Sequence, residues 1–561
     1  MPVAVAKLEL PANMAGHEKG SRHKAWSKAA VRVLLCHPDV YEAAAGSTAL
    51  NILYQLVHRR AAWLAERAFL WTPEWRTRFQ EKKIPAFSLE SKHPVKDFHL
   101  IGISMPSELL YPNLVQFLLD AELAPWADKR GEHEPLIAVG GVASFNPLPI
   151  APLVDVVFVG EAEESFVEVI EALQAMPKAS KADKLLALSR IPGVYVPSVH
   201  RQETAVVSKR VLRNLNLLTE LTEPVVPYGW EKKPRASLQL MRGCVWKCRY
   251  CQAGFTTLPV RHLNADQVMQ TVEDLRHYGI DEVGLLALNV IDHPQLPDLL
   301  KRLAPQHSHV KVPAVKMDHV NSDLMRPMGP QAYSLALEAG TERLRFAINR
   351  PYTDAAWRMA VAHILDAKGN RINMDFMLGL PTETDVDVRG IAKTAMAVGD
   401  LVAGKAELSV SIAAFVPKPH TPFQWHKQVL PDDIRRRFAL LQETIKVQPH
   451  VRFHFRNPES SLVEGLLARG GTEVAPLIIA AAKAGLPDLP WGTRFLSATW
   501  IGLATDFGID LEAVVGKAHA PSADLPWDVI SVGVQKKYLQ REWKKTMDAS
   551  TLKEGEIPWD N

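Results

Sequence analysis

The chain has 561 residues, of which 47% are hydrophobic and 23% charged, so we expect several globular domains with sizeable cores. The formal net charge of +3 does not indicate a nucleic-acid-binding surface, and no apolar run is long enough to predict a membrane-spanning helix. Four cysteines and the lack of a signal-peptide pattern predict a cytoplasmic protein.

The first third of the chain predicts strands that alternate with helices. Residues 1–28 are polar and irregular and are expected to form an N-terminal extension. Over residues 29–177 the alternation predicts a doubly wound parallel sheet, whose ligands lie beyond the carboxyl ends of the strands. Buried strands are predicted at 31–36, 68–71, 100–104, 136–140 and 155–159, and helices at 47–60 and 164–173. The residues at the predicted carboxyl ends are Ser104, Gly140, Gly141, Gly160 and Glu161.

A second α/β domain is predicted over residues 236–430, after a connector at 178–235. Strands and helical segments alternate there in the rhythm of a parallel β/α barrel, whose active site lies at the carboxyl ends of the strands. After residue 430 the pattern becomes mostly helical, with one short strand predicted at 451–455, so residues 431–561 are expected to form a helical C-terminal domain. The six predicted barrel strands are 236–241, 283–288, 310–317, 334–340, 371–378 and 408–415.

Three of the four cysteines lie within eight residues, directly after the first barrel strand. Cys244, Cys248 and Cys251 have the spacing Cys-x3-Cys-x2-Cys, which lets a short loop wrap three thiolates around an iron–sulfur cube. The fourth iron would then stay open for a substrate or cosubstrate. A zinc knuckle would need a fourth ligand, and a disulfide pair is not expected in a long chain so poor in cysteine. The neighbouring Arg242, Lys247 and Arg249 would offset the negative charge of a cluster.

This cysteine stretch resembles the signature of the radical S-adenosylmethionine (SAM) enzymes, in which the open iron binds SAM and electron transfer cleaves it to a 5′-deoxyadenosyl radical. The resemblance implies a partial (β/α)6 barrel, a [4Fe–4S] cluster on the three cysteines, and an electron donor such as flavodoxin or ferredoxin. It extends to residues 337–345, where Glu338 would contact SAM. It also covers residues 377–384, where Gly379 and Glu383 would line the adenine pocket.

Two of these residues have other interpretations that the sequence leaves open. Glu338 could be a surface carboxylate that faces Arg343 or Arg345. Glu383 could cap the helix that follows it.

Residues 29–177 resemble the cobalamin-binding domain that precedes the barrel in one subclass of this family. The resemblance rests on Gly140-Gly141, Pro147 and residues 159–163, and it implies that the five carboxyl-end residues named above contact cobalamin. The Asp-x-His-x-x-Gly motif of that subclass is missing, because His37 precedes Asp39 here. His37 is therefore interpreted as a loop histidine and Cys36 as a buried strand thiol.

The sequence thus predicts a radical SAM enzyme, with cobalamin-dependent methylation or related radical chemistry as the main hypothesis. Its substrate and catalytic residues are not identified, and nucleic acid is not expected as a partner. One alternative is a cobalamin-independent enzyme, such as a tRNA methylthiotransferase or a radical oxidoreductase. A methylthiotransferase is disfavoured, because the front domain lacks the extra cluster cysteines and the C-terminus lacks a basic RNA module. A non-catalytic cobalamin or redox sensor would not need the motifs around Glu338 and Gly379.

Overall fold

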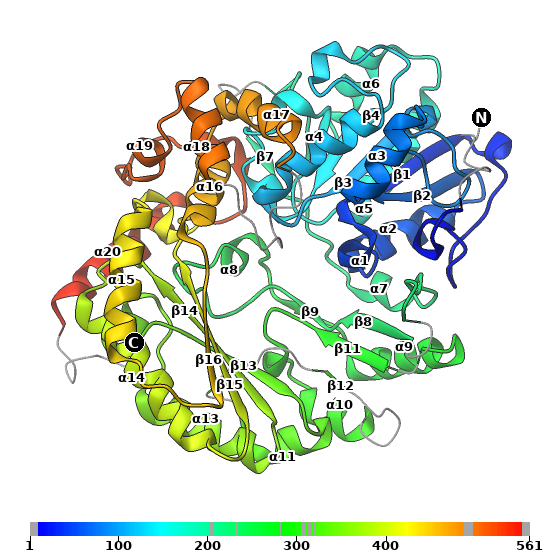
Figure 1. Ribbon diagram of the computed structural model, residues 1–561. Helices are drawn as coiled ribbons and strands as arrows, with labels where there is room; N and C mark the ends of the chain where they lie inside the picture. The colour runs from blue at the N-terminus through cyan, green and yellow to red at the C-terminus, as the bar shows by residue number, and fades with distance from the viewer. Residues whose placement is uncertain are drawn as a thin grey trace. The chain divides into compact units, whose positions relative to one another are not determined.

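The chain folds into two compact units, which we call the front unit and the barrel unit. The front unit comprises residues 1–234, 466–510 and 524–533, and the barrel unit comprises 235–465, 511–523 and 534–561. The residues predicted as a separate C-terminal domain, 431–561, are therefore divided between the two units. The structure, a computed structural model (Figure 1), describes residues 9–200, 206–230, 234–280, 282–303, 310–311, 317, 320–486 and 497–552.

The front unit is built on a six-stranded sheet in the order β2-β1-β3-β4-β5-β6. The first five strands pair in parallel and β6 joins β5 antiparallel, so the predicted parallel sheet is confirmed. The order 2-1-3-4-5 is typical of doubly wound folds. The strands are β1 (Val31–Val40), β2 (Trp63–Leu70), β3 (Leu100–Ser104), β4 (Leu136–Gly140), β5 (Val156–Phe158) and β6 (Val194–Tyr195).

Helices cover this sheet. Alternate residues of β1, from Val31 to Leu35, pack in one core with apolar side chains of α2 and α5. Helix α4 packs against β1 and against α17, which the chain supplies from beyond residue 466. The helices of the front unit include α1 (Tyr41–Ala44), α2 (Thr48–His58), α3 (Pro73–Glu81), α4 (Tyr111–Asp120), α5 (Glu163–Ala175), α6 (Lys181–Leu188), α7 (Asn216–Thr219), α17 (Ala475–Lys483) and α18 (Ser497–Asp506).

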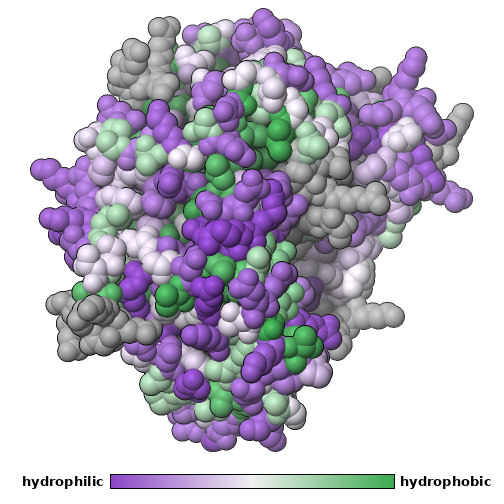
Figure 2. All heavy atoms as spheres, turned by 60° about the vertical axis from the view of Figure 1, so that its left-hand side comes forward, coloured by the Kyte–Doolittle hydropathy of each residue, from purple (hydrophilic) through white to green (hydrophobic). Residues whose placement is uncertain are grey.

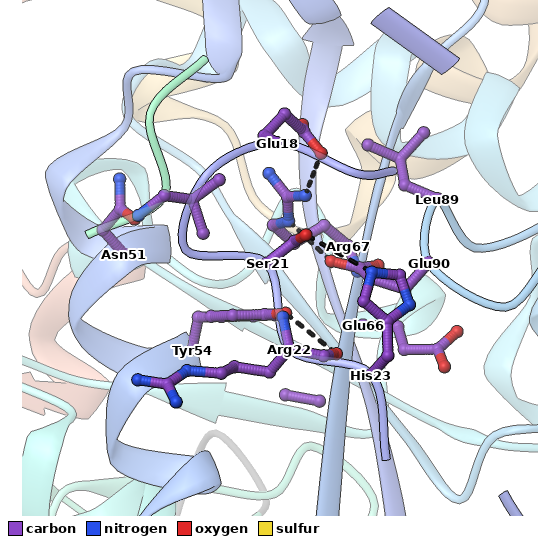
Figure 3. A network of polar contacts seen from close by, with 12 residues as sticks. Glu18, Ser21, Arg22, His23, Asn51, Tyr54, Glu66, Arg67, Leu89 and Glu90 are labelled. Carbon is purple, nitrogen blue, oxygen red and sulfur yellow. Dashed lines mark hydrogen bonds and ion pairs between the residues drawn. The ribbon is translucent and has the colours of Figure 1, made fainter. Parts of the chain in front are cut away.

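A buried ion network ties the N-terminal segment to β2, as Figure 3 shows. Arg67 of β2 donates through Nε to Glu90 and through a terminal nitrogen to Glu18, both at 2.8 Å. The side chains of the three residues are 0–4% exposed. Lys92 adds a second anchor, because its Nζ donates to the carbonyl oxygen of Met14 at 2.8 Å. The described part of the predicted N-terminal extension is therefore packed onto the sheet.

The barrel unit contains two parallel sheets, ordered β12-β11-β8 and β13-β14-β15-β16. The strands predicted at 236–241, 283–288, 334–340, 371–378 and 408–415 are confirmed, and residues 312–316 of the third predicted strand lie outside the described residues. The strands are β8 (Arg235–Gln239), β11 (Glu282–Leu286), β12 (Val310–Lys311), β13 (Ala332–Glu338), β14 (Arg371–Leu378), β15 (Glu407–Ala414) and β16 (Val451–Phe455).

Strand β16 extends the barrel sheet beyond the predicted boundary at residue 430. It pairs in parallel with β15, and the four strands β13–β16 lie side by side (Figure 1). The prediction had placed this strand among the C-terminal helices. The helices of the barrel unit include α9 (Ala265–His277), α10 (Leu296–Leu303), α11 (Ser322–Met325), α12 (Glu342–Ala347), α13 (Asp354–Asp366), α14 (Asp385–Val402), α15 (Pro431–Thr444), α19 (Leu511–Val515) and α20 (Lys536–Asp548); α16 (Pro458–Arg469) crosses from this unit into the front unit.

The surface shows no extended apolar band on the face seen in Figure 2, where small hydrophobic groups are separated by hydrophilic residues. Exposed hydrophobic side chains such as Met359 and Val386 belong to different helices, α13 and α14. No helix within the described residues is long and apolar enough to span a membrane.

Candidate active site

The three clustered cysteines lie in the loop that joins β9 (Met241–Arg242) to α8 (Ala253–Thr256). The loop follows residues 236–241, the first predicted barrel strand, which the structure divides into β8 (Arg235–Gln239) and β9. Strand β9 pairs antiparallel with β10 (Arg261–His262), which closes the base of the loop. Gly243 begins the loop at φ +88°, and a Cβ there would lie 2.8 Å from the carbonyl oxygen of Pro259. The position therefore requires glycine.

Side chains from other parts of the barrel unit hold the cysteine loop in place. The Asn349 amide donates to the carbonyl oxygen of Trp246 at 2.9 Å and to that of Lys247 at 3.2 Å. The buried Arg249 donates to the Glu542 carboxylate of α20 at 3.0 Å and to the carbonyl oxygen of Ala347 at 2.8 Å. Arg249 is thus an anchor of the loop, and its charge is balanced by Glu542 rather than available to a cluster.

Burial disfavours the thiolate form of two of the three cysteines. Burial raises the pKa of the Cys251 thiol to about 11, and the neighbouring Cys248 and Cys244 add to that effect. Burial also raises the pKa of Cys244. A bound metal cation would stabilise a thiolate at either position.

Within the described residues, no group of three or more His, Cys, Asp or Glu side chains is gathered closely enough to hold a single metal ion. A cube accepts more widely spaced sulfurs, since each thiolate binds a different iron. Cluster binding by the three cysteines stays a prediction.

Glu338 lies at the carboxyl end of β13 and faces the cysteine loop. Burial raises its pKa to about 7, while the charge of Arg350 and a hydrogen bond from Tyr250 of the loop act in the opposite direction. Its backbone has φ +68°, which is uncommon for a residue with a side chain and marks a position held by its surroundings.

The alternative interpretation of Glu338 as a surface carboxylate paired with nearby arginines is wrong. Arg343 binds Asp387 at 2.5 Å. The buried Arg345 donates to the carbonyl oxygen of Tyr352 at 2.7 Å and pairs with Asp354. Both arginines have partners of their own, and the role of Glu338 towards SAM stays a prediction.

Gly379 and Glu383 form the turn that follows β14. The Gly379 N–H donates to both carboxylate oxygens of Glu383, at 3.0 and 3.1 Å, and Arg437 Nε lies 3.0 Å from the same carboxylate. The Glu383 side chain is 1% exposed. The buried Glu383 carboxylate therefore stabilises the turn by accepting hydrogen bonds from its backbone. The suggested helix cap is provided instead by Thr384 with Asp387 at the start of α14. Contact of this turn with adenine stays a prediction.

In the front unit, the residues expected to contact cobalamin do lie at the carboxyl ends of strands, and nearby backbone accounts for two of the glycines, Gly141 and Gly160. Ser104 ends β3 and Gly140 ends β4. A Cβ at Gly141 would lie 2.5 Å from the carbonyl oxygen of Met105, and one at Gly160 would clash with that of Arg210.

The same edge of the front sheet makes further contacts with its own chain. Glu161 accepts a hydrogen bond from the N–H of Leu212 at 2.6 Å. Beyond β4, the Asn146 amide donates to the carbonyl oxygens of Ala468 and Gly470, both at 2.9 Å. These residues therefore do not provide a fit for a corrin, and cobalamin binding stays a prediction without support from them.

His37 belongs to β1 rather than to a loop, so that part of the prediction is wrong. The strand continues through Pro38 to Val40, with a register shift against β2 between His37 and Val40. Burial lowers the pKa of His37 to about 4. Cys36 is a fully buried strand thiol, as expected.

Sequence reasoning missed the residue that brings positive charge to the cysteines. Arg350 follows α12, and one of its terminal nitrogens lies 3.5 Å from the sulfur of Cys248. Its Nε donates to the carbonyl oxygen of Ala336 in β13 at 2.9 Å. About a hundred residues separate Arg350 from the loop, so no local pattern could have indicated the contact.

Two family descriptions match this chain. The chain matches the family described as "Radical SAM proteins, N-terminal" over residues 49–197 and the "Radical SAM superfamily" over residues 238–395. It is 25% identical over 395 residues to an uncharacterised protein of Methanocaldococcus jannaschii, covering 70% of this chain and 83% of that protein.

More distant similarities are also present. The tRNA-2-methylthio-N(6)-dimethylallyladenosine synthase of Chloroflexus aurantiacus is 26% identical over 276 residues, which cover 45% of this chain and 57% of that enzyme. The enzyme of the same name from Pseudomonas savastanoi is 25% identical over 355 residues, or 58% of this chain and 71% of that enzyme. A solved structure of HydG, a maturase of the [FeFe]-hydrogenase, aligns with 71% of this chain and 90% of that chain at 13% identity. Its TM-score of 0.27 is too low to establish a shared fold.

The matched segments correspond to the two units found in the structure. Residues 49–197 lie in the front unit, and residues 238–395 contain the cysteine loop, Glu338 and Gly379. The chain therefore carries two domains of the radical SAM superfamily, the N-terminal one and the one that gives the superfamily its name.

Proposed function

We propose that the chain is a radical SAM enzyme that binds one [4Fe–4S] cluster through Cys244, Cys248 and Cys251 and cleaves SAM reductively. The observation that carries the proposal is the anchored three-cysteine loop at the carboxyl end of a parallel barrel strand, next to Glu338. The bound cluster would supply the electron that cleaves SAM. The carboxylate of Glu338 is suited to accept hydrogen bonds from an amine or a ribose hydroxyl.

Polar side chains on the inner face of the barrel sheet are suited to contact a polar substrate. Asp375, Ser411 and His454 occupy the same level of β14, β15 and β16, because Asp375 pairs with Ser411 and Ser411 with His454. The apolar residues on either side of Asp375, Met374 and Phe376, are buried, so the strand turns its other face to the helices. Within the described residues, none of these three polar side chains makes a hydrogen bond, although the charge of Arg456 acts on Asp375. They are suited to contact a ligand.

The class of reaction remains a hypothesis. Cobalamin-dependent methylation is suggested by the resemblance of the front unit and by its strand order. We assign it no step, because Gly141, Gly160 and Glu161 are engaged by nearby backbone. tRNA methylthiolation is suggested by the named relatives, although Cys36 is the single cysteine outside the loop. An electron donor of the flavodoxin or ferredoxin class and a cytoplasmic location complete the proposal, since a reduced cluster needs both electrons and protection from oxygen.

The test is anaerobic reconstitution of the full chain, followed by iron and sulfide assays and a visible spectrum. Wild-type protein should hold about four irons, and with dithionite and SAM it should form 5′-deoxyadenosine. Replacing Cys244, Cys248 and Cys251 together with alanine should abolish both results. Cys36→Ala is the matched control and should keep the iron, because this thiol is buried in the front sheet. Full iron in the triple variant would refute the proposal.

A second measurement addresses the reaction class. Added cobalamin should bind the reconstituted protein, with a shift in the corrin spectrum, if the methylation hypothesis holds. No binding at concentrations that saturate known cobalamin domains would remove that hypothesis and leave the radical SAM proposal intact.

A further inference from the structure

Arg350 occupies a distinctive position between the cysteine loop and the strand that carries Glu338. Its terminal nitrogen lies 3.5 Å from Cys248 Sγ, and its Nε donates to the carbonyl oxygen of Ala336 at 2.9 Å. Its guanidinium carbon is 5.3 Å from the centre of the Tyr352 ring. Three different contacts therefore fix the direction of this side chain.

The backbone before Arg350 explains how the side chain reaches the loop. Helix α12 ends at Ala347, and Asn349 then adopts φ +56°, which turns the chain sharply. The N–H of Arg350 donates to the carbonyl oxygen of Arg345 at 2.8 Å. Asn349 and Arg350 consequently both contact the cysteine loop, the first through carbonyl oxygens and the second through a sulfur.

Arg350 differs from the other arginines near the loop in what surrounds it. Arg249 is balanced by the carboxylate of Glu542, and Arg242 donates to the side chain of Gln239. The groups that interact electrostatically with Arg350 include Cys248, Cys244, Glu338 and the phenols of Tyr250 and Tyr352. Its positive charge therefore acts mainly on the cluster-binding loop and on the strand end beside it.

We propose that Arg350 is a positioning residue that donates a hydrogen bond to the Cys248 thiolate and thereby raises the reduction potential of the cluster. This inference rests on the proposed function. Reduction adds one electron to a cluster that already carries thiolate charge, and a cation on a ligand sulfur stabilises the more negative state. The electron comes from an external donor, and no covalent bond changes. Without this contact, the cluster would be harder to reduce by the same donor.

The test compares variants of the full chain by a redox titration followed by electron paramagnetic resonance. Arg350→Met and Arg350→Gln remove the charge, Arg350→Lys keeps it without the planar guanidinium, and Arg358→Met is the control. Arg358 carries the same charge on the exposed outer side of α13. Iron content is measured first for every variant, so that changes in potential are read from intact clusters.

The neutral variants should show a clear fall in midpoint potential. The hydrogen bond is present in both oxidation states, and only its greater strength in the more negative state shifts the potential. At the wild-type midpoint, the ratio of reduced to oxidised cluster should therefore fall several-fold, where a tenfold fall is about 59 mV for a one-electron couple. Arg350→Lys should lie between the neutral variants and the wild type, and Arg358→Met should match the wild type.

Several results would overturn the inference. Neutral variants whose potential equals that of Arg358→Met would show that the contact to Cys248 does not act on the cluster. If the neutral variants fail to take up iron, the Arg350→Lys variant provides the test. A midpoint potential equal to that of the wild type in this variant would refute a role for the guanidinium. A wild-type protein that binds no cluster would refute the proposed function instead, so the two failures are distinguishable.

Discussion

The ion network beneath the N-terminal segment yields a prediction that the structure makes quantitative. Arg67 bridges Glu18 and Glu90, and its own N–H also donates to Glu90 at 2.8 Å. Replacing Arg67 with methionine would keep most of the side-chain volume but leave two carboxylates without their cation. Since these carboxylates are 0% exposed, water cannot replace the lost partner.

The expected loss of unfolding free energy is about 3–5 kcal/mol at pH 7, the usual range when one partner of a buried ion pair is removed. The loss should shrink in acid, because the stranded carboxylates can then be neutralised by protons. Replacing Glu18 and Glu90 with glutamine in the Arg67→Met background should recover part of the stability, since the uncompensated charges disappear.

Urea unfolding of the full chain, followed by tryptophan fluorescence, measures the effect. Hydrogen exchange of peptides from β2 and from residues 9–21 locates it. The control is Arg78→Met on helix α3, whose partner Glu74 is exposed, and it should change stability by less than about 1 kcal/mol. An Arg67→Met variant within about 1 kcal/mol of the wild type would contradict the reasoning, because it would mean that the buried carboxylates do not need the arginine.

Three further predictions follow from single positions. Glu338→Gln should weaken SAM binding by about 1.5–3 kcal/mol at unchanged iron content, and calorimetry that shows equal affinity would remove Glu338 from the SAM site. His37→Gln should make the front unit less sensitive to acid. Burial lowers the pKa of His37 in the folded wild type to about 4, so the wild type loses up to roughly 3 kcal/mol of unfolding free energy as the pH falls from ~6.5 towards 4. The melting temperature of the wild type at pH 7.5 and pH 5 checks this, and an equal drop in the variant would exclude His37 as a cause. Gly340→Ala should lower the stability of the barrel unit by about 1–3 kcal/mol, because its Cβ would clash with backbone of α14 at Ile391 and Asp387. An unchanged urea midpoint would show that α14 can move away.

The sequence predicted most strands correctly because the strands of parallel sheets are buried and read as short apolar runs. It also placed the cysteine loop after the first barrel strand. Strand β16 was predicted as part of the helical C-terminal region rather than of the barrel. None of its residues is fully buried, so its sequence does not show the apolar run that is typical of a strand in a parallel sheet. The end of β1 was misread because Pro38 normally stops a strand, whereas here the register shift accommodates it.

The arrangement around the cysteines depends on contacts between distant residues, which a single sequence does not reveal. Arg350 meets Cys248 across a separation of 102 residues, and Arg249 meets Glu542 across 293. The spacing of the cysteines indicated a cluster. It could not indicate which of the neighbouring arginines serves the sulfur and which one is balanced by a carboxylate.

Both units include residues from the C-terminal part of the chain, so neither unit can finish folding until those residues have been synthesised. The front unit includes residues 466–510 and 524–533, and its strand β7 (Val207–Ser208) pairs with β17 (Ile530–Ser531). The anchor of the cysteine loop, Arg249 with Glu542, spans 293 residues, which a ribosome adds in roughly 15–60 s at about 5–20 residues per second. During that interval the ion pair between Arg249 and Glu542 cannot form, whereas Asn349, about a hundred residues after the loop, is already available to hold it. The two anchors of the loop therefore become available at different times, and the one from α20 comes second.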